Sequence, residues 1–565
     1  MNNEELAAVF KRIARLLEIK GENPYKIRAY RRAAEALQNL PTPAAQLRDE
    51  RRLTEIPGVG EAIAKKIAEL LDTGRLAFLE RLEKEMPPGL LELTALPGLG
   101  PKKVRRLWQE LGITDVDALE AAAQYHRLRD LPGFGAKTEA QLLAAIAARR
   151  AQPTGYLLGE AYPLAQRLLA RLREMPGVAQ AELAGSTRRG KAMVGDVDLL
   201  LATDTPRQTL EAVRALWPAA AEITGSATEA EVSAPAVEGV PVHVLAATPP
   251  RFGTAWVLST GSAAHRAALQ ARAQALGRPA DAPFPTEEAF YQALGLTWIP
   301  PELRENQGEI EAAAQAALPR LVQQGDCRAE LHSHTQWSDG HASIREMAEA
   351  AIARGLKVLA ITDHTQSLGI AHGLTPERLR AQRAEIRQVQ AQLGDRIVLL
   401  QGAEVEILAD GRLDYPDDVL AELDVVIASL HTALRQPREQ ITARLLKAMS
   451  NRYVHIIAHP SGRLLPHRPG ADLDWPAVLA AAAEHGLALE INAHPRRLDL
   501  TDQLVRQAVE RGIPLALNTD AHRPADFDQR FYGLLTARRG WAQAPHIINT
   551  WPTDRLLTWL RQKRA

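Results

Sequence analysis

The chain has 565 residues, 46% of them hydrophobic and 24% charged, and this length exceeds what a single hydrophobic core supports, so we expect two to four domains. Its 68 Lys and Arg balance 68 Asp and Glu, which gives no overall electrostatic signature of nucleic-acid binding, and no apolar run approaches the roughly 18 residues of a membrane span. The single cysteine, Cys327, excludes an intrachain disulfide and a cysteine-based zinc site, which leaves His, Asp and Glu as metal ligands.

The first 150 residues contain one short motif three times, as IPGVG at 56–60, LPGLG at 96–100 and LPGFG at 131–135. Each copy lies between helical patterns, where proline and paired glycines break the helix and turn backbone N–H groups outward at the start of the next helix. These amides and the positive end of the helix dipole favour phosphate. One copy is equally consistent with a plain turn, but three copies favour binding. The expected phosphate-contacting residues are Gly58, Gly60, Gly98, Gly100, Gly133, Gly135, Lys102 and Lys103.

The repeated motif resembles the helix-hairpin-helix motif, which grips the DNA backbone without reading its sequence. Residues 23–31, NPYKIRAYR, look like the N-terminal helical domain of family X DNA polymerases. In eukaryotic repair members of that family this domain carries a lyase lysine, and the matching residue by register is Lys66. A lysine on an exposed helix is more often a solubilising charge, so lyase chemistry and simple phosphate contact both stay open for Lys66.

Residues 183–200 combine a Gly-Ser turn, a basic loop and two aspartates followed by apolar residues. Asp196 and Asp198 occupy alternate positions of an expected strand, so their carboxylates share a face and can hold metal ions together. This arrangement suits phosphoryl transfer, which uses divalent cations to bridge a hydroxyl and a triphosphate. The pattern resembles the palm of the polymerase beta-like nucleotidyltransferases. The resemblance implies Mg or Mn at the two catalytic aspartates and nucleotide contacts from Gly185, Ser186, Arg189 and Gly195.

The resemblance to this palm fails at its third aspartate. The candidate strand is 240–245, VPVHVL, and His243 stands where the family pattern predicts Asp. A histidine cannot bridge two hard cations, because only one ring nitrogen is free to coordinate at a time. Glu238 is the nearest acid, but its spacing places it on the other face of a regular strand. Since the expected thumb is also short, we expect polymerisation to be weakened or lost.

From Arg328 the chain alternates short apolar runs with helical stretches, which is typical of a parallel sheet or barrel. The expected strands are 329–332, 358–362, 397–404, 425–430, 455–458, 487–491 and 514–517. Six of the seven end in, or run directly into, a potential metal ligand, and barrel enzymes place their chemistry at the C-terminal ends of strands. One such histidine alone is more often a surface residue, but the conjunction indicates a metal site. The expected ligands are His332, His334, Asp339, His364, Glu404, His431, His459, Asp520 and His522.

The order of these ligands resembles the polymerase-and-histidinol-phosphatase (PHP) domain, and all nine ligand positions of that family are filled. The resemblance implies a distorted seven-stranded (β/α)7 barrel that hydrolyses phosphoesters. Mixed nitrogen and oxygen ligands favour two or three Mn or Zn ions over Mg or Ca. The implied ligand groups are His332, His334, Glu404 and Asp520, then Glu404, His431 and His459, and then Asp339, His364 and His522.

Together these parts predict a multidomain α and α/β protein. The expected order is a helix-hairpin-helix domain over 1–150, an α+β palm with a small thumb over 151–305, a linker over 306–327 and a PHP domain over 328–565. This order resembles the bacterial family X DNA polymerases with a fused exonuclease.

The family resemblance implies a cytoplasmic, nucleoid-associated DNA repair enzyme, a monomer without membrane contact. It would act on gapped or 3'-ended DNA of any sequence and use dNTPs if the palm is active. We expect 3'-5' exonuclease activity to dominate, with incision at abasic sites as a further activity. A small-molecule phosphatase of the histidinol-phosphatase type and a non-catalytic DNA-binding scaffold remain as alternatives.

Overall fold

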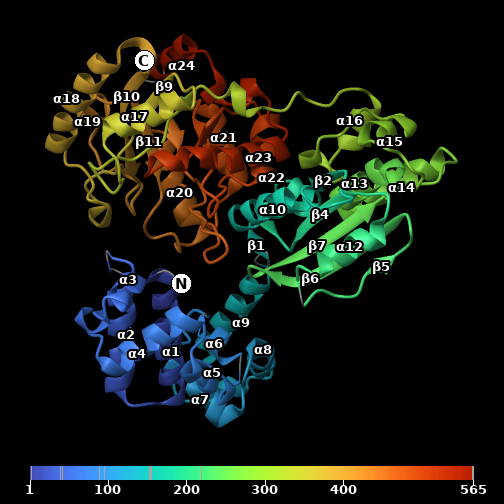
Figure 1. The fold of residues 1–565 in the computed structure, drawn as a ribbon. Coiled ribbons are helices and arrows are strands. Elements are labelled where there is room, and N and C mark those ends of the chain that lie inside the picture. The colour runs from blue at the N-terminus through green and yellow to red at the C-terminus, as the bar shows by residue number, and fades with distance from the viewer. Residues whose placement is uncertain are drawn as a thin grey trace. The chain divides into compact units, whose positions relative to one another are not determined.

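The computed structural model describes residues 1–562 other than 2, 39, 41, 88, 95, 152–154 and 218. The chain divides into two compact units, Met1–Gln152 and Pro153–Ala565 (Figure 1). In the described part of the first unit all regular structure is helical, whereas the second unit contains every strand.

The first unit packs amphipathic helices around one core. Its buried centre includes Phe10, Leu37, Ile67, Val104 and Phe134, which come from segments along its whole length. Each helix contributes an apolar stripe, as the 3.6-residue period of its sequence dictates. The helices are α1 (Asn3–Lys20), α2 (Pro24–Gln38), α3 (Ala44–Asp49), α4 (Glu61–Thr73), α5 (Ala77–Lys84), α6 (Leu90–Leu93), α7 (Pro101–Leu111), α8 (Val116–Gln124) and α9 (Ala136–Ala151).

The three Pro-Gly motifs form the same turn. The first glycine of each copy is left-handed, with φ of 81° at Gly58, 83° at Gly98 and 89° at Gly133. The second glycine precedes a helix, α4, α7 or α9, and a side-chain carbon added there would meet no atom within 4 Å. The backbone at these three helix starts is therefore not covered by other atoms on the side where a side chain would stand.

The second unit begins with a five-stranded sheet in the order β2-β4-β7-β6-β5, which we call the palm sheet because it lies in the expected palm. Its strands are β2 (Gln180–Leu183), β4 (Val197–Ala202), β5 (Thr224–Gly225), β6 (Glu229–Val237) and β7 (Val240–Ala247), and a separate pair joins β1 (Tyr156–Leu157) to β3 (Met193–Val194). Alternate residues of β4 pack on opposite faces: Leu199 and Leu201 contact the cluster that includes α10, while Leu200 packs with Phe252 of α13. The helices of this part are α10 (Leu158–Arg173), α11 (Gly185–Arg188), α12 (Pro206–Arg214), α13 (Phe252–Thr260), α14 (Ala263–Ala275), α15 (Glu287–Ala293) and α16 (Glu309–Ala314).

The segment 306–327, which the sequence suggests as a linker, is packed against the preceding helices. It carries α16, and its Ile310 and Ala313 are buried in one cluster with Leu303 and Leu321. Its Glu309 accepts a hydrogen bond from the buried His265 of α14 at 2.5 Å.

The last part of the chain forms a seven-stranded, fully parallel sheet in the order β14-β13-β12-β11-β10-β9-β8. A bridge between Ser333 and Ala521 brings the two ends together, so the barrel is nearly closed. This confirms the predicted distorted (β/α)7 barrel. The strands are β8 (Ala329–Glu330), β9 (Val358–Ile361), β10 (Val398–Glu406), β11 (Val425–Ser429), β12 (Ile456–Ile457), β13 (Ala488–Asn492) and β14 (Leu515–Asn518).

Small and branched residues fill the barrel interior, and the last helix covers it. Ala360, Ile427 and Ile456 pack in one cluster with Leu556 and Leu560 of α24. This apolar cluster leaves the C-terminal ends of the strands as the place for the predicted metal ligands. The helices of this part are α17 (Ile344–Ala353), α18 (Pro376–Leu393), α19 (Asp417–Leu420), α20 (Arg438–Met449), α21 (Trp475–Glu484), α22 (Asp502–Glu510), α23 (Arg530–Arg539) and α24 (Thr553–Gln562).

Helix α23 ties the barrel to the palm sheet within the second unit. The guanidinium of Arg539 donates to Glu305 at 2.9 Å, to Asp502 at 2.8 Å and to the carbonyl of Arg189 at 3.1 Å. Leu535 of the same helix is buried in the core cluster of the palm sheet. These contacts explain why residues 153–565 form one compact unit.

Candidate metal centre

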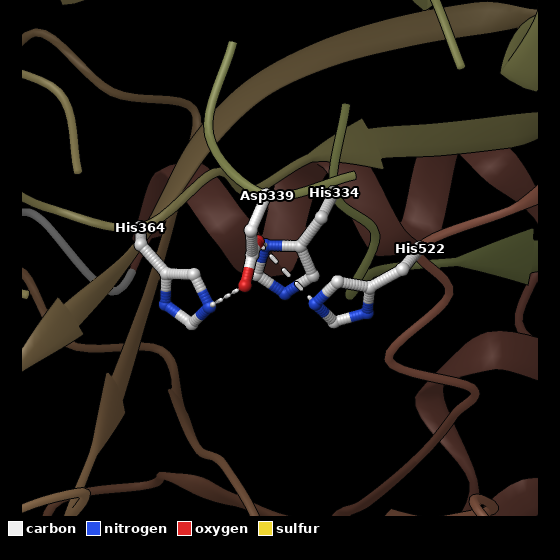
Figure 2. A group of neighbouring side chains, drawn as sticks. All are labelled: His334, Asp339, His364 and His522. Carbon is white, nitrogen blue, oxygen red and sulfur yellow. Dashed lines mark ion pairs between the residues drawn. The ribbon is translucent and has the colours of Figure 1, made fainter. Parts of the chain in front are cut away.

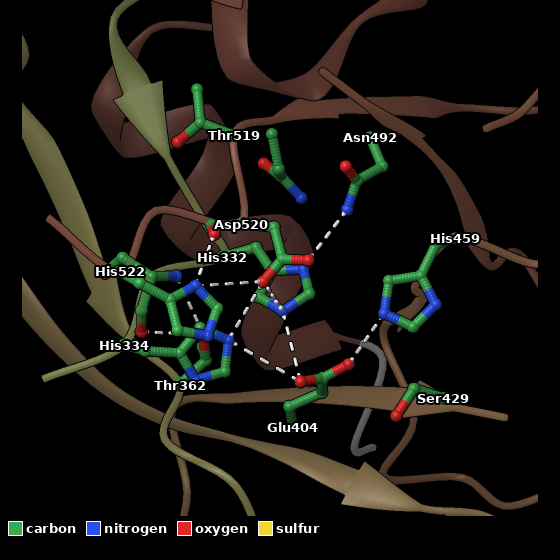
Figure 3. A network of polar contacts seen from close by, with 12 residues as sticks. His332, His334, Thr362, Glu404, Ser429, His459, Asn492, Thr519, Asp520 and His522 are labelled. Carbon is green, nitrogen blue, oxygen red and sulfur yellow. Dashed lines mark hydrogen bonds and ion pairs between the residues drawn. The ribbon is translucent and has the colours of Figure 1, made fainter. Parts of the chain in front are cut away.

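The strand order brings all nine predicted ligands to one end of the barrel. His332 and His334 follow β8, His364 follows β9, and Glu404 lies within β10. The remaining ligands follow β11, β12 and β14, except Asp339, which lies in the loop after β8. Figure 3 shows the carboxylate of Glu404 among these side chains.

The first ligand group is deeply buried and matches the expected one. His332, His334, Glu404 and Asp520 offer four ligand atoms that lie within 4.8 Å of one another. Nε2 of His334 lies 3.1 Å from Oδ1 of Asp520 and 3.5 Å from Oε2 of Glu404. Nε2 of His332 lies 3.4 Å from the same Glu404 oxygen.

The two oxygens of Glu404 face different histidines. Oε2 lies 2.9 Å from Nδ1 of His364, whereas Oε1 lies 3.2 Å from Nε2 of His431 and 2.9 Å from Nε2 of His459. One carboxylate placed in this way can bridge two cations. Glu404 and His431 form a group of mutually close ligand atoms with His364, whereas the expected third member of this group was His459.

Asp339 lies among three imidazoles (Figure 2). Its Oδ2 is 3.5 Å from Nε2 of His364, and its Oδ1 is 3.4 Å from Nε2 of His522 and 3.9 Å from Nδ1 of His334. His334 therefore joins the expected group of Asp339, His364 and His522, with one ring nitrogen toward this group and the other toward the first.

The donor set fits divalent cations. Several buried polar atoms of the cluster have no hydrogen-bond partner within the described chain: Nε2 of His332, Nδ1 and Nε2 of His334, Nδ1 of His364 and Oε2 of Glu404. Buried polar groups without partners are costly and rare in folded proteins. These atoms converge on common points, so cations held there would satisfy them together.

The protonation states of two central ligands suit cation binding. Burial, with the neighbouring His522 and His364, lowers the pKa of His334 to about 3, so this ring is neutral and has a free lone pair. Burial acts to raise the pKa of Glu404, but the imidazoles of His431, His364 and His332 outweigh it and hold that pKa well below its usual range. Glu404 is therefore an anion at neutral pH.

Sequence reasoning missed two buried glutamates that orient ligands. Oε1 of Glu490, on β13, lies 2.7 Å from Nδ1 of His332, and its Oε2 accepts the backbone N–H of His459 at 2.7 Å. Glu406, on β10, lies 2.8 Å from Nδ1 of His431. A partner on one ring nitrogen fixes the orientation of the other, which here faces the cluster. The available signal was a charged residue inside an apolar strand.

A third buried acid, Asp363, holds the loop between His334 and Asp339. It accepts hydrogen bonds from the backbone N–H of Thr335 at 2.8 Å, the hydroxyl of Thr335 at 2.6 Å and the amide of Gln382 at 2.6 Å. This network places Asp339 opposite His364.

In the palm sheet, His243 lies directly opposite Asp198 in the parallel pair of β4 and β7. Nδ1 of His243 is 3.2 Å from Asp198, and its Nε2 is 3.1 Å from Glu231 of β6, an acid that sequence reasoning missed. The hydrogen bond with Asp198 is the main cause that raises the pKa of His243. Asp196 lies directly before β4, and burial together with the adjacent carboxylate of Asp198 raises its pKa, so the two acids lie side by side as expected.

The predicted nucleotide-binding residues are placed differently from one another. Gly185 has φ of 59°, and a side-chain carbon there would collide with the carboxylate of Asp198, so this turn requires glycine. Ser186 belongs to the short helix α11, and Gly195 has open space around it. Arg189 is buried and donates to Glu305 at 2.8 Å and to the carbonyl of Thr260 at 2.7 Å, which weighs against a phosphate contact.

The predicted lysines of the first unit differ in their contacts and exposure. Nζ of Lys66 donates to the carbonyl of Ala62 at 3.1 Å and lies 5.3 Å from the ring centre of Phe78. Nζ of Lys103 donates to the carbonyl of Gly98 at 3.0 Å, which braces the second turn, while Lys102 is exposed.

No helix within the described residues combines the length and the apolar character that crossing a membrane requires.

Comparison with known proteins agrees with this architecture. Residues 1–76 match the helix-hairpin-helix domain family, residues 90–148 the SAM-like helix-hairpin-helix tandem, and residues 330–494 the PHP domain. The DNA polymerase/3'-5' exonuclease PolX of Bacillus subtilis (strain 168) is 37% identical over 561 residues, which cover 97% of each chain. A probable phosphatase of Thermoanaerobacter sp. (strain X514) is 30% identical over 248 residues, 42% of this chain and 95% of the phosphatase. The chain therefore belongs to the bacterial family X DNA polymerases that carry a fused PHP domain.

Proposed function

We propose that the C-terminal barrel is a metal-dependent 3'-5' exonuclease that shortens DNA at gaps and 3' ends. The observation that carries this proposal is the convergence of nine imidazole and carboxylate side chains, Glu404 among them, at one end of the barrel. The Bacillus subtilis relative, which matches over nearly its full length, is named a 3'-5' exonuclease.

The residues of the cluster have distinct roles in this proposal. Two or three ions, Mn or Zn by the chemistry of the donors, would lower the pKa of water and neutralise charge on the phosphate oxygens. The six histidines together with Asp339, Glu404 and Asp520 would hold them, with Glu490 and Glu406 fixing the rings of His332 and His431. Water adds its oxygen to phosphorus as the bond to the 3' oxygen breaks, which leaves a shortened strand with a 3' hydroxyl and a free 5'-mononucleotide.

The three glycine turns supply DNA binding without sequence preference. Gly60, Gly100 and Gly135 leave open backbone at the starts of three helices, which is the geometry that binds phosphate. Contacts of this kind hold DNA of any sequence, as an enzyme of repair requires. The same metal cluster would incise abasic sites, and Lys66 remains the candidate for lyase chemistry.

In the palm, His243 weakens polymerisation. The histidine stands between Asp198 and Glu231, where a third carboxylate would otherwise help to hold a cation. Asp196 and Asp198 would still bind Mg or Mn and a dNTP. The protein would act as a monomer in the cytoplasm, on the nucleoid.

A primer-template assay with Mn tests these assignments together. The wild type is expected to shorten a 5'-labelled primer, whereas His334→Ala is expected to lose at least about 100-fold in rate because it removes a ligand shared by two groups. The exposed His467 provides a matched control, since His467→Ala changes the same residue type away from the cluster. Wild-type activity in His334→Ala would refute the assignment of the cluster.

The second candidate is a small-molecule phosphatase, which the resemblance of residues in the barrel to probable phosphatases favours. Hydrolysis of histidinol phosphate or p-nitrophenyl phosphate that DNA fails to compete, without shortening of DNA, would support this alternative. A protein that retains no metal and stays inactive with Mn would support a DNA-binding scaffold.

A further inference from the structure

A cavity of about 540 Å³ opens directly beside the metal cluster. Three of the candidate ligands, Asp339, Asp520 and His522, form part of its wall, and so do the basic residues Arg497 and Arg523. A substrate that reaches the cluster through this cavity therefore passes both guanidinium groups.

Arg497 lies close to the cluster. Its side chain is only 15% exposed, and its Nε lies 3.7 Å from Oδ2 of Asp520, beyond hydrogen-bond distance. The other oxygen of Asp520 faces His334 and His332. Asp520 thus pairs with this guanidinium on one side and faces the ligand histidines on the other, and a second anion at the site would further screen the repulsion between the guanidinium and bound cations. A phosphate of the substrate is the anion that the proposed reaction supplies.

The backbone that carries Arg497 is held in place. Nε of Arg463 donates to the carbonyl of Arg497 at 2.6 Å, and a second nitrogen of Arg463 donates to the carbonyl of Leu498. The backbone N–H of Asn492 donates to the carbonyl of Asp499 at 2.6 Å, which closes the loop. Because the backbone of this loop is held in place, substrate binding does not have to order it, and the entropy cost of using Arg497 is smaller.

Arg523 lies further out. It directly follows His522, its side chain is exposed, and one of its terminal nitrogens lies 3.4 Å from Nε2 of His341. The acid nearby, Asp526, is engaged by the backbone N–H groups of His522 at 3.0 Å and Arg523 at 2.9 Å. The guanidinium of Arg523 therefore has no strong ion pair with this carboxylate.

We propose that Arg497 and Arg523 form a phosphate-binding subsite that selects a polynucleotide over a small phosphate ester. Arg497 contacts the phosphate that is cut, and Arg523 contacts the next phosphate along the retained strand. A guanidinium binds phosphate through two parallel hydrogen bonds, which positions the group as well as neutralising it. This inference rests on the proposed exonuclease, and it predicts which contact each substrate can make.

The two arginines are separated by comparing a long and a short substrate in the full-length protein with Mn. On a 5'-labelled single-stranded oligonucleotide, Arg523→Ala is expected to raise KM about tenfold with kcat unchanged, because it removes one charged phosphate contact. On thymidine 5'-(p-nitrophenyl phosphate), which has a single phosphate, the same variant is expected to match the wild type. Arg497→Ala is expected to lower kcat/KM about 100-fold on both substrates.

A binding measurement gives a readout that does not depend on turnover. Titration of thymidine 5'-monophosphate into the Mn-containing protein is expected to show a Kd about tenfold weaker in Arg497→Ala. Arg496→Ala is the matched control, because Arg496 is the exposed neighbour of Arg497 and does not line the cavity. If Arg497→Ala binds less Mn than the wild type, Arg497→Lys replaces it, and partial recovery of binding is expected.

Equal Kd values in the wild type and the Arg497 variants, or an Arg523→Ala variant that loses equally on both substrates, would overturn the subsite. If the wild type itself fails to shorten DNA, the proposed exonuclease is wrong. The titration then still tests the subsite, because thymidine monophosphate offers the phosphate alone.

Discussion

Glu404 is the residue through which the ligand groups meet, since its two oxygens face different sets of histidines. It is buried on β10, the strand between β9 and β11. The charge of this one side chain balances imidazoles on both sides.

Glu404→Gln keeps the size of the side chain and removes its charge. We expect the variant to bind fewer Mn ions per chain and to lose at least about 100-fold in nuclease rate, because an amide cannot bridge two cations. Metal content by mass spectrometry and the primer assay measure the two effects. Glu484→Gln, an exposed change on α21, should leave both unaffected.

Glu490 tests whether a buried carboxylate that contacts a ligand histidine orients its ring. Since it holds Nδ1 of His332 at 2.7 Å, Glu490→Gln should weaken Mn affinity about 10- to 100-fold while the fold persists. Raising the Mn concentration should restore the nuclease rate. A variant that stays inactive in saturating Mn would show that Glu490 has another role.

At the scale of elements, the register of β4 against β7 supports the proposal that His243 weakens the palm. Asp198 and His243 are direct neighbours across this pair, and Glu231 lies on the next strand. His243→Asp should therefore increase primer extension with dNTPs at least about tenfold, because it returns a hard ligand beside Asp198. Extension by the wild type as rapid as by the variant would show that the histidine does not impair the palm.

The repeated glycine turns make a prediction that depends on salt. Lys102 is exposed in the first turn of α7, next to Gly100. Lys102→Ala should weaken binding to all DNA sequences alike and reduce the slope of log affinity against log salt by about one. Lys84→Ala, exposed at the end of α5, serves as the control. A loss of affinity for some sequences only would contradict backbone binding.

The sequence predicted the order of the strands and helices better than it predicted the direction in which their side chains point. Apart from Glu404 and Asp339, the barrel ligands follow short apolar runs, so most of the strands and candidates could be predicted from spacing, and the family resemblance completed the set. Glu490 and Glu406 lie inside such runs, and spacing gives no sign of a buried acid there. Whether His364 or His459 completes a group depends on side-chain direction, which the sequence does not encode locally.

At the scale of the molecule, partners that are distant in sequence determine the contacts of Arg189. Its spacing after Gly185 suggests a phosphate contact, but its partner Glu305 lies 116 residues away, and Arg539, which binds its carbonyl, lies 350 residues away. The same contacts join the palm sheet to the barrel. The sequence pattern suggested a linker over 306–327 and did not show that side chains of this segment are buried against the residues before it.

Arg539→Ala tests this coupling. The change leaves Asp502 without its cation and Glu305 with Arg189 alone, and it should cost about 3 kcal/mol, since removing one partner of a buried ion pair leaves charge unpaired. Thermal unfolding should shift to lower temperature for palm and barrel together. Two separate transitions in the wild type would contradict a single cooperative unit.

Anomalous diffraction at the manganese edge from crystals of the Mn-containing protein would show directly whether cations bind around Glu404. We expect peaks within bonding distance of Glu404, with further contacts to His332, His334, His364 and Asp520. An active, Mn-containing protein with no anomalous peak beside Glu404 would contradict this expectation.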